Sequence, residues 1–92
     1  MPAAPTVSRD EGVLAQRVLA DTLLLDPATG SYTRLNESGA LLWDALARPA
    51  SVDELAARLA ERYGLEAQRA TADAERFVAS LADRGMVRVE GG

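Results

Sequence analysis

A turn signal between two strand-like segments constrains the fold of this 92-residue chain more than any other feature. The segment DPATG, residues 26–30, combines the aspartate, proline and glycine that favour a tight reversal of the chain. Residues 23–25 before it are a run of leucines, and residues 31–35 after it, SYTRL, point alternately to opposite faces. The sequence therefore predicts an antiparallel hairpin whose second strand carries Tyr32 and Arg34 on one face.

Another strand-like segment, VLAQRVLAD, precedes the hairpin. Val13 and Val18 are residues that favour strands, and Ala20-Asp21 provides a turn before the leucine run. We therefore expect two or three short antiparallel strands. The chain begins with MPAAP, in which two prolines oppose a regular ladder, so residues 1–12 are predicted to form a flexible N-terminal segment.

Three amphipathic helices are predicted after the hairpin. Asn36 is a suitable N-cap for the first helix, and Ser51 and Glu54 have the spacing of a capping box for the second. Gly64 and Gly85 are placed to end the second and third helices. The apolar positions that recur at helical spacing, and so predict the core, are Leu42, Trp43, Ala45, Leu46, Val52, Leu55, Ala56, Leu59, Tyr63, Ala70, Ala74, Phe77, Val78 and Leu81.

The order of these elements predicts an α+β fold. The third helix is expected over residues 67–84, and residues 86–89, MVRV, predict a short final strand that folds back on the core. A small three-stranded antiparallel sheet packed on three helices resembles a winged helix-turn-helix. We expect one domain over residues 13–89, followed by a tail at residues 90–92.

The residue types that are missing limit the catalytic reactions and the metal sites that this chain can support. The chain has no cysteine and no histidine, and all ten of its basic residues are arginine. These absences exclude thiolate and imidazole catalysis, cysteine and histidine metal sites, and Schiff-base chemistry. Paired carboxylates remain, but a hydrolytic pair needs a walled substrate groove that so short a chain does not readily house. We therefore expect a protein that is not an enzyme and that uses no cofactor or metal.

Charge and hydropathy exclude further classes of partner. The formal net charge of −4 and the pI near 4.7 argue against a nucleic-acid binder, because such proteins neutralise phosphates with basic side chains. No segment has the apolar length of a membrane span, and MPAAPTVSRDEG lacks the features of a signal peptide. The sequence thus predicts a cytoplasmic protein, monomeric or weakly dimeric, with neither nucleic acid nor membrane as its partner.

Two interpretations of the strand SYTRL, residues 31–35, stay open at this point. It is a solvent-exposed outer strand, which the pattern alone favours, or it is an edge to which an extended peptide adds as a further strand. Exposed edges are usually protected by proline, lysine or a bulge, whereas this strand carries only Arg34. Because nothing protects this edge, the addition of a peptide strand stays open as the second interpretation.

The predicted third helix carries a second stripe beside its apolar one. Asp73, Phe77, Ser80 and Arg84 fall within about 60° of one another when residues advance by 100°. Phe77 is then either an ordinary core residue beside a solvated flank or the aromatic floor of a groove with charged edges. Spacing alone favours the core.

Three segments together resemble a known family. LLLDPATGSYTRLNESGALLWDAL is followed by SVDELAARLAERYG and by FVASLADRGMV, and in this order they are similar to the PqqD-like proteins. The resemblance covers residues 13–89, and its most specific part is LD..TG.Y..LN..GA..W over residues 25–43. PqqD-like proteins are recognition elements for ribosomally made, modified peptides (RiPPs).

The resemblance implies a fold and a binding mode. Family members pack a three-stranded antiparallel sheet on three helices, and the leader of a precursor peptide adds beside the third strand, against the third helix. This implies a non-catalytic peptide chaperone whose leader-binding residues are Tyr32, Thr33, Arg34, Leu35, Asp73, Phe77, Ser80, Leu81 and Arg84.

The wording TG.Y..LN..GALLW is most similar to the stand-alone recognition proteins of lasso-peptide biosynthesis. That likeness implies a separate leader peptidase and a cyclase as partners. The pyrroloquinoline quinone (PQQ) and mycofactocin members, which serve radical SAM enzymes, remain an alternative. A winged-helix DNA-binding regulator and a purely structural or dimerisation module are alternatives from other classes of protein.

Overall fold

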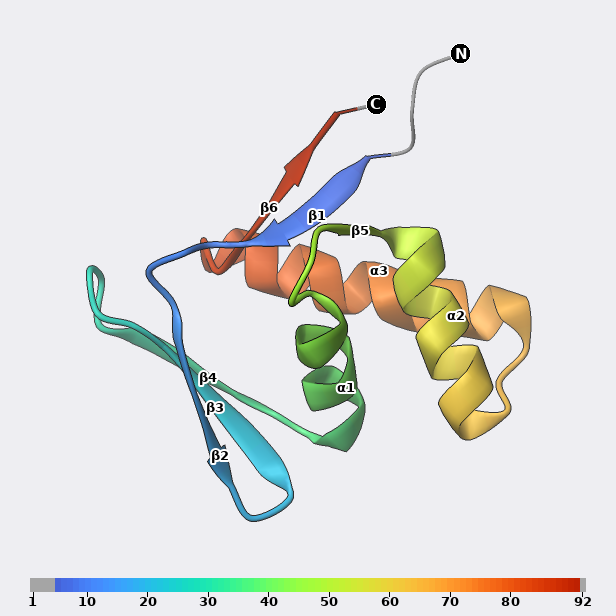
Figure 1. Cartoon of the computed structure of the whole chain (residues 1–92), viewed down its shortest axis with the longest axis horizontal. Helices are drawn as coiled ribbons and strands as arrows, with labels where there is room; N and C mark the ends of the chain where they lie inside the picture. Colours follow the sequence, from blue (N-terminus) through green and yellow to red (C-terminus); the bar gives the residue numbers. More distant parts are fainter. Residues whose placement is uncertain (1–4, 92) are drawn as a thin grey trace.

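The computed structural model describes residues 5–91 and contains two small sheets and three helices (Figure 1). The elements in chain order are β1 (Thr6–Arg9), β2 (Leu14–Val18), β3 (Asp21–Asp26), β4 (Ser31–Leu35), α1 (Glu37–Ala45), β5 (Ala50–Ser51), α2 (Val52–Tyr63), α3 (Ala67–Asp83) and β6 (Val87–Glu90). This confirms the α+β class with three helices. The sequence predicts one three-stranded sheet, whereas the structure has two.

The first sheet has the order β2-β3-β4 and is antiparallel throughout. The predicted hairpin is confirmed, with Asp26 opposite Ser31 and the Gly30 N–H donating to the carbonyl of Asp26 at 2.8 Å. Gly30 has a φ of 73°, which a residue without a Cβ adopts at little cost. Burial alternates along β4 as predicted, from the exposed Tyr32 to the buried Leu35.

The second sheet has the order β5-β1-β6 and joins the two ends of the chain. Its central strand, β1, falls inside residues 1–12, where the sequence predicts a flexible segment. The structure differs because Val7 is fully buried and both neighbouring strands come from much later in the chain. Residues 1–4 of the expected flexible segment and Gly92 of the expected tail lie outside the described residues.

Arg9 of β1 connects the second sheet to α1 through its contacts with Trp43. Its guanidinium carbon lies 4.5 Å from the centroid of the Trp43 ring, and its Nη2 donates to the carbonyl oxygen of Trp43. Burial lowers the pKa of Arg9, while the carboxylate of Asp44 acts in the opposite direction. The contact links residues 34 positions apart, so no local sequence pattern indicates it.

The predicted helix boundaries are confirmed by their caps. Asn36 accepts a hydrogen bond from the Gly39 N–H at 2.9 Å, and Ser51 and Glu54 form the reciprocal capping box, with both bonds at 3.1 Å. Gly64 ends α2 in the left-handed conformation, with a φ of 66°. The helix α3 ends at Asp83, one residue before the predicted boundary.

The core lies between the helices and the inner faces of both sheets. Its largest fully buried side chains come from every layer: Val7, Leu24, Leu42, Leu46, Leu55, Leu81 and Met86. Trp43 is buried as predicted, at 2% exposure. Four predicted core residues differ, since Tyr63 is 37% exposed and Ala45, Val52 and Phe77 are half-buried. Val89, expected to fold back on the core, is 48% exposed.

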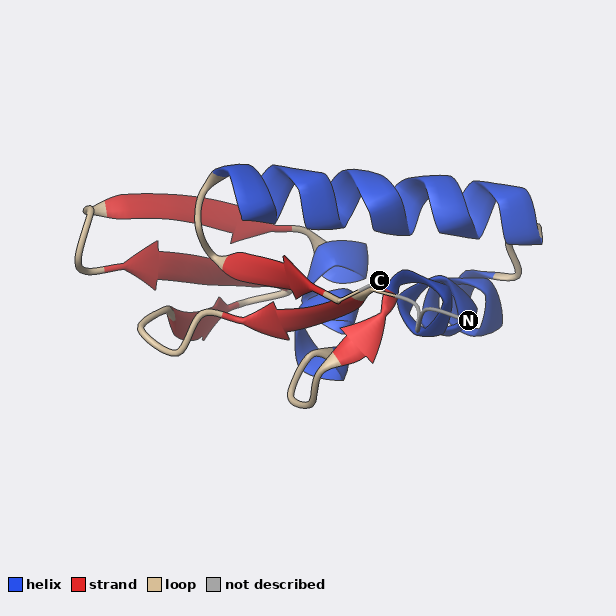
Figure 2. Ribbon diagram, turned by 90° about the horizontal axis from the view of Figure 1, so that it is seen from above, coloured by secondary structure: helices blue, strands red, loops and turns tan. Residues whose placement is uncertain are grey.

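The β2-β3-β4 sheet extends from one end of the molecule, and α2 lies at the other end, with α1 between them (Figure 1). The long helix α3 forms a layer of its own along one side (Figure 2). Within the described residues, no helix combines the length and the apolar character needed to span a bilayer.

Candidate functional site

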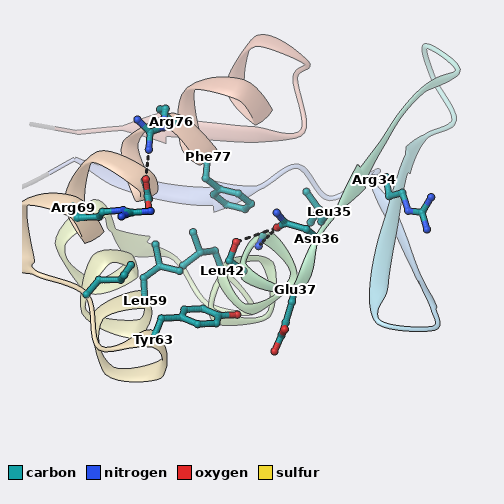
Figure 3. Close-up of a pocket in the computed structure, with 14 residues that line it drawn as sticks. Arg34, Leu35, Asn36, Glu37, Leu42, Leu59, Tyr63, Arg69, Arg76 and Phe77 are labelled. Carbon is teal, nitrogen blue, oxygen red and sulfur yellow. Dashed lines mark hydrogen bonds and ion pairs between the residues drawn. The ribbon is translucent and has the colours of Figure 1, made fainter.

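A hollow of about 760 Å³ opens where the end of β4 meets three helices (Figure 3). Strand β4, the loop into α1, and the helices α1, α2 and α3 all contribute to its walls. The residues that line it are Arg34, Leu35, Asn36, Glu37, Ser38, Gly39, Leu42, Leu59, Tyr63, Leu65, Arg69, Asp73, Arg76 and Phe77.

The floor of this groove is apolar. Leu42 and Leu59 are each 2% exposed and lie between two aromatic rings (Figure 3). Phe77 of α3 points inward from one side and Tyr63 of α2 from the other. An apolar floor between two aromatic rings suits an apolar or aromatic side chain of a ligand.

The local sequence explains why β4 runs so closely into α1. Asn36 caps the helix directly after Leu35, so only one residue separates the strand from the helix. A Cβ at Gly39 would lie 3.3 Å from the Cβ of Leu35 and 3.4 Å from the Asn36 Oδ1. Glycine therefore permits the close approach that brings the end of β4 to the edge of the groove.

The rim of the groove on α3 carries a cluster of charges. Asp73 pairs with Arg76 and lies 3.8 Å from the Nε of Arg69, so one carboxylate serves two guanidinium groups. Both arginines remain largely exposed, at 72% and 74% of their side chains. This rim therefore carries a net positive charge and suits an acidic side chain.

The charges on the other sides of the groove are already paired. The Nε of Arg34 lies 2.6 Å from the Asp21 Oδ2, across the β3–β4 ladder. Glu37 at the start of α1 lies 3.1 Å from Arg62 at the end of α2. These exposed pairs add little stability, but they leave α3 as the side with unmatched charge.

Strand β4 is an open edge of its sheet. Among the described residues it pairs only with β3, so alternate N–H and C=O groups from residues 31–35 have no strand partner. Neither proline nor a bulge interrupts the strand. An extended chain that continued this ladder would lie directly beside the apolar groove.

Four of the predicted site residues line the groove together: Arg34, Leu35, Asp73 and Phe77. Tyr32 and Thr33 belong to β4 but lie outside the hollow. The side chain of Tyr32 is 67% exposed and lies opposite Leu25, on the outer face of the sheet.

The C-terminal part of α3 contributes differently from what the sequence predicts. Leu81 is 2% exposed and belongs to the core, as its helical spacing predicts, and it is not among the residues that line the groove, where the resemblance implies a leader-binding role. Ser80 and Arg84 are exposed but lie outside the hollow. The position of Arg84 follows from helix geometry, because it is eleven residues, or about 16 Å, beyond Asp73.

The groove residues that the sequence did not indicate as site residues include residues 36–39 at the start of α1, the core residues Leu42 and Leu59, and four residues of α2, α3 and the loop between them. Arg69 and Arg76 flank Asp73 at helical spacing, a pattern that was readable in the sequence. Tyr63 and Leu65 reach the groove from the end of α2 and the following loop, which only the packing of α2 on α3 brings about. Within the described part of the chain, no group of three or more acidic residues is arranged to hold a metal ion.

Comparisons with known proteins find solved structures with the same fold. A search of solved structures finds "TbiB1 in Complex with the TbiA(beta) Leader Peptide", with a TM-score of 0.80 at 20% identity, over 88% of this chain and 94% of that one. It also finds "Lasso peptide synthetase B1 complexed with the leader peptide", with a TM-score of 0.76 at 26% identity, over 89% of this chain and 96% of that one. A search of curated proteins finds no match.

A family model described as "Coenzyme PQQ synthesis protein D (PqqD)" matches residues 21–87. The match extends from the start of β3 to the first residue of β6 and so includes every element that lines the groove. It covers well over half of the sequence. The chain belongs to the PqqD family.

Proposed function

We propose that this chain is a RiPP recognition element that binds the leader segment of a precursor peptide by strand addition to β4. One observation carries the proposal: the open edge of β4 runs directly into an apolar groove walled by α3. A peptide in that position gains main-chain hydrogen bonds from the edge and a pocket for its side chains. The two similar structures, which are complexes with leader peptides, support the same use of this fold.

Binding proceeds without chemistry by this chain. A leader that is disordered when free becomes ordered against β4, which costs part of the interaction energy. Alternate side chains of the added strand face the groove, where the rings of Phe77 and Tyr63 receive an apolar residue. An affinity between micromolar and nanomolar, or about −8 to −12 kcal/mol, suits such a transient carrier.

Charge on α3 sets the preference among leaders. Asp73 is already paired with Arg69 and Arg76, so the rim offers guanidinium groups to the ligand. We expect an acidic leader residue near this rim, with Arg84 too far along the helix to contact the same residue. Tyr32 and Thr33 contribute through their backbone groups.

Delivery to processing enzymes follows from effective concentration. Holding the leader close to a leader peptidase and then a cyclase raises the rate of processing without new contacts to the substrate. The likeness to "Lasso peptide synthetase B1 complexed with the leader peptide" supports this pathway. The family description names coenzyme PQQ synthesis, so a radical SAM partner of the PQQ type is the alternative. The genes beside this one distinguish them, since a peptidase and a cyclase indicate a lasso pathway and a radical SAM enzyme contradicts it.

The charges of α3 argue against the DNA-binding alternative. A recognition helix in the major groove presents basic side chains to phosphates. Here Arg69 and Arg76 are offset by Asp73, Glu75 and Asp83 on the same helix. Filter binding to random duplex DNA at low salt is expected to detect no complex.

Titration with a synthetic leader peptide, followed by amide NMR shifts, tests the proposal. The peptide takes the leader sequence of the precursor encoded beside this gene. We expect shifts at residues 31–35 and along α3, because the added strand contacts both. Shifts confined to the exposed face of α2 would contradict strand addition at β4.

A further inference from the structure

The second sheet also has an open edge, formed by β6. Within residues 5–91, β6 pairs with β1 and has no strand on its other side (Figure 1). The Asp10 N–H donates to the carbonyl of Met86 at 2.9 Å, and this pair continues the β1–β6 register. Since hydrogen-bonded pairs alternate along an antiparallel ladder, Arg88 and Glu90 bond to β1. The backbone groups of Val87 and Val89 therefore face outward.

The side chains of β6 do not protect this edge. Val87 is buried at 3% exposure, whereas Val89 on the same face is 48% exposed. Arg88 and Glu90 are exposed on the opposite face. A single sign of charge would repel a second strand, but here opposite charges occur two positions apart.

We propose that β6 pairs with β6 of a second copy of this chain, antiparallel, across a two-fold axis at Val89. Val89 lies opposite the partner's Val89, and their outward N–H and C=O groups exchange two hydrogen bonds. Arg88 lies opposite the partner's Glu90, and the symmetry repeats this pair. The two sheets join into one continuous sheet, with the order β5-β1-β6 repeated across the axis.

Charge selects this register over its nearest competitor. A two-fold axis at Arg88 also pairs outward-facing groups, but it places two guanidinium groups opposite each other. These positions are the close, non-hydrogen-bonded pairs, about 4.5 Å apart at Cα, where like charges destabilise most. An axis at Val89 fills the same positions with opposite charges. The register at Val89 therefore leaves no like-charge pair across the axis.

Charge gives β4 no comparable preference for pairing with a second copy of itself. An axis at Thr33 would set Tyr32 opposite the partner's Arg34, so no carboxylate on the facing strand would pair with the guanidinium. Arg34 is moreover already paired with Asp21. Pairing through β6 therefore leaves β4 and its groove free, and the inference does not rest on the proposed peptide binding.

The predicted association is weak, since β6 has only four residues. A contact of this size lies well below the areas of stable dimers, so we expect dissociation constants of about 0.1–1 mM. Analytical ultracentrifugation from about 10 μM to 1 mM protein, at physiological salt, measures it. The weight-average mass is expected to rise toward that of a dimer across this range.

Charge exchange tests the register. Arg88→Glu sets two carboxylates opposite each other twice, and we expect about tenfold weaker association. The double variant Arg88→Glu/Glu90→Arg restores the opposite pairs and the association. Arg58→Glu on α2 is the matched control, because it changes the net charge equally, on an exposed residue away from β6. Circular dichroism verifies that each variant is folded.

Three results would overturn the inference. A monomer mass that stays constant up to about 1 mM excludes self-pairing of the expected strength. Equal weakening by Arg58→Glu and Arg88→Glu shows that general repulsion, and not the β6 pair, governs association. A double variant that stays as weak as Arg88→Glu excludes the axis at Val89.

Discussion

At the scale of single residues, Arg9 interacts with two neighbouring residues of α1. Its guanidinium stacks on Trp43, donates to the carbonyl oxygen of the same residue, and lies near Asp44. The side chain is partly removed from water, and this burial lowers the pKa of Arg9. The stacking and the hydrogen bond offset part of that loss of hydration and hold β1 against α1, while the Arg9 Nε is buried without a hydrogen-bond partner among the described residues.

Replacing Arg9 with alanine is expected to lower the free energy of unfolding by about 1–2 kcal/mol, since a stacked cation and a hydrogen bond are lost. Urea denaturation followed by tryptophan fluorescence measures this change at the only tryptophan of the chain. Arg88→Ala is the control, because Arg88 is exposed on β6. An equal effect of the two substitutions would show that the contact with Trp43 contributes nothing specific.

At the scale of elements, the helix termini are set by their neighbours in the chain. The second helix has the full capping box of Ser51 and Glu54, whereas Glu66 at the start of α3 makes no side-chain capping bond. Both N-cap residues have extended backbone angles suited to capping. The two helices therefore form a natural pair for comparison.

Removing the cap of α2 with Ser51→Ala is expected to destabilise the protein by about 1 kcal/mol, because the N–H of Glu54 loses its acceptor. Thermal unfolding by circular dichroism measures the effect. Ser31→Ala, in β4 and without a capping role, is the control. A melting temperature that falls no further for Ser51→Ala than for Ser31→Ala would contradict the role of the cap.

Supplying a cap to α3 with Glu66→Asp is expected to stabilise the protein by about 0.5–1 kcal/mol, since aspartate reaches the free N–H groups of the first turn and glutamate does not. The charge is unchanged, so the gain reports the capping bond. The same thermal measurement applies. A second variant, Glu66→Gln, preserves the length of the side chain and is expected to bring no gain.

At the scale of the whole molecule, the groove is a product of packing. Its lining residues come from β4, α1, α2 and α3, and each element alone shows only part of a polar or apolar face. Tyr63 shows this best, because the sequence predicts a core residue and the structure turns it toward the groove. Its ring is half-covered and lies 5.3 Å from the Arg62 guanidinium.

Replacing Tyr63 with alanine is expected to weaken leader binding about tenfold, since one aromatic wall of the groove is lost. Isothermal titration with the synthetic leader measures the affinity. Tyr32→Ala is the matched control, because Tyr32 is exposed outside the groove and contributes only backbone to strand addition. Equal losses for both variants would place the peptide on the outer face of the sheet instead.

By itself, the sequence determined the parts whose hydrogen bonds close within a few residues. The DPATG hairpin, the caps at Asn36 and Ser51, and the end of α2 at Gly64 were all predictable, because turn and cap bonds join near neighbours in the chain. The family was also readable from the order of its motifs.

The tertiary structure alone decided what depends on distant partners. Strand β1 has no local signal, since its partners β5 and β6 lie more than 40 residues away along the chain. The same holds for the Arg9–Trp43 contact and for Tyr63, which the packing of α2 on α3 brings to the groove. Such positions follow from which faces bury each other, and that choice is made by the whole fold at once.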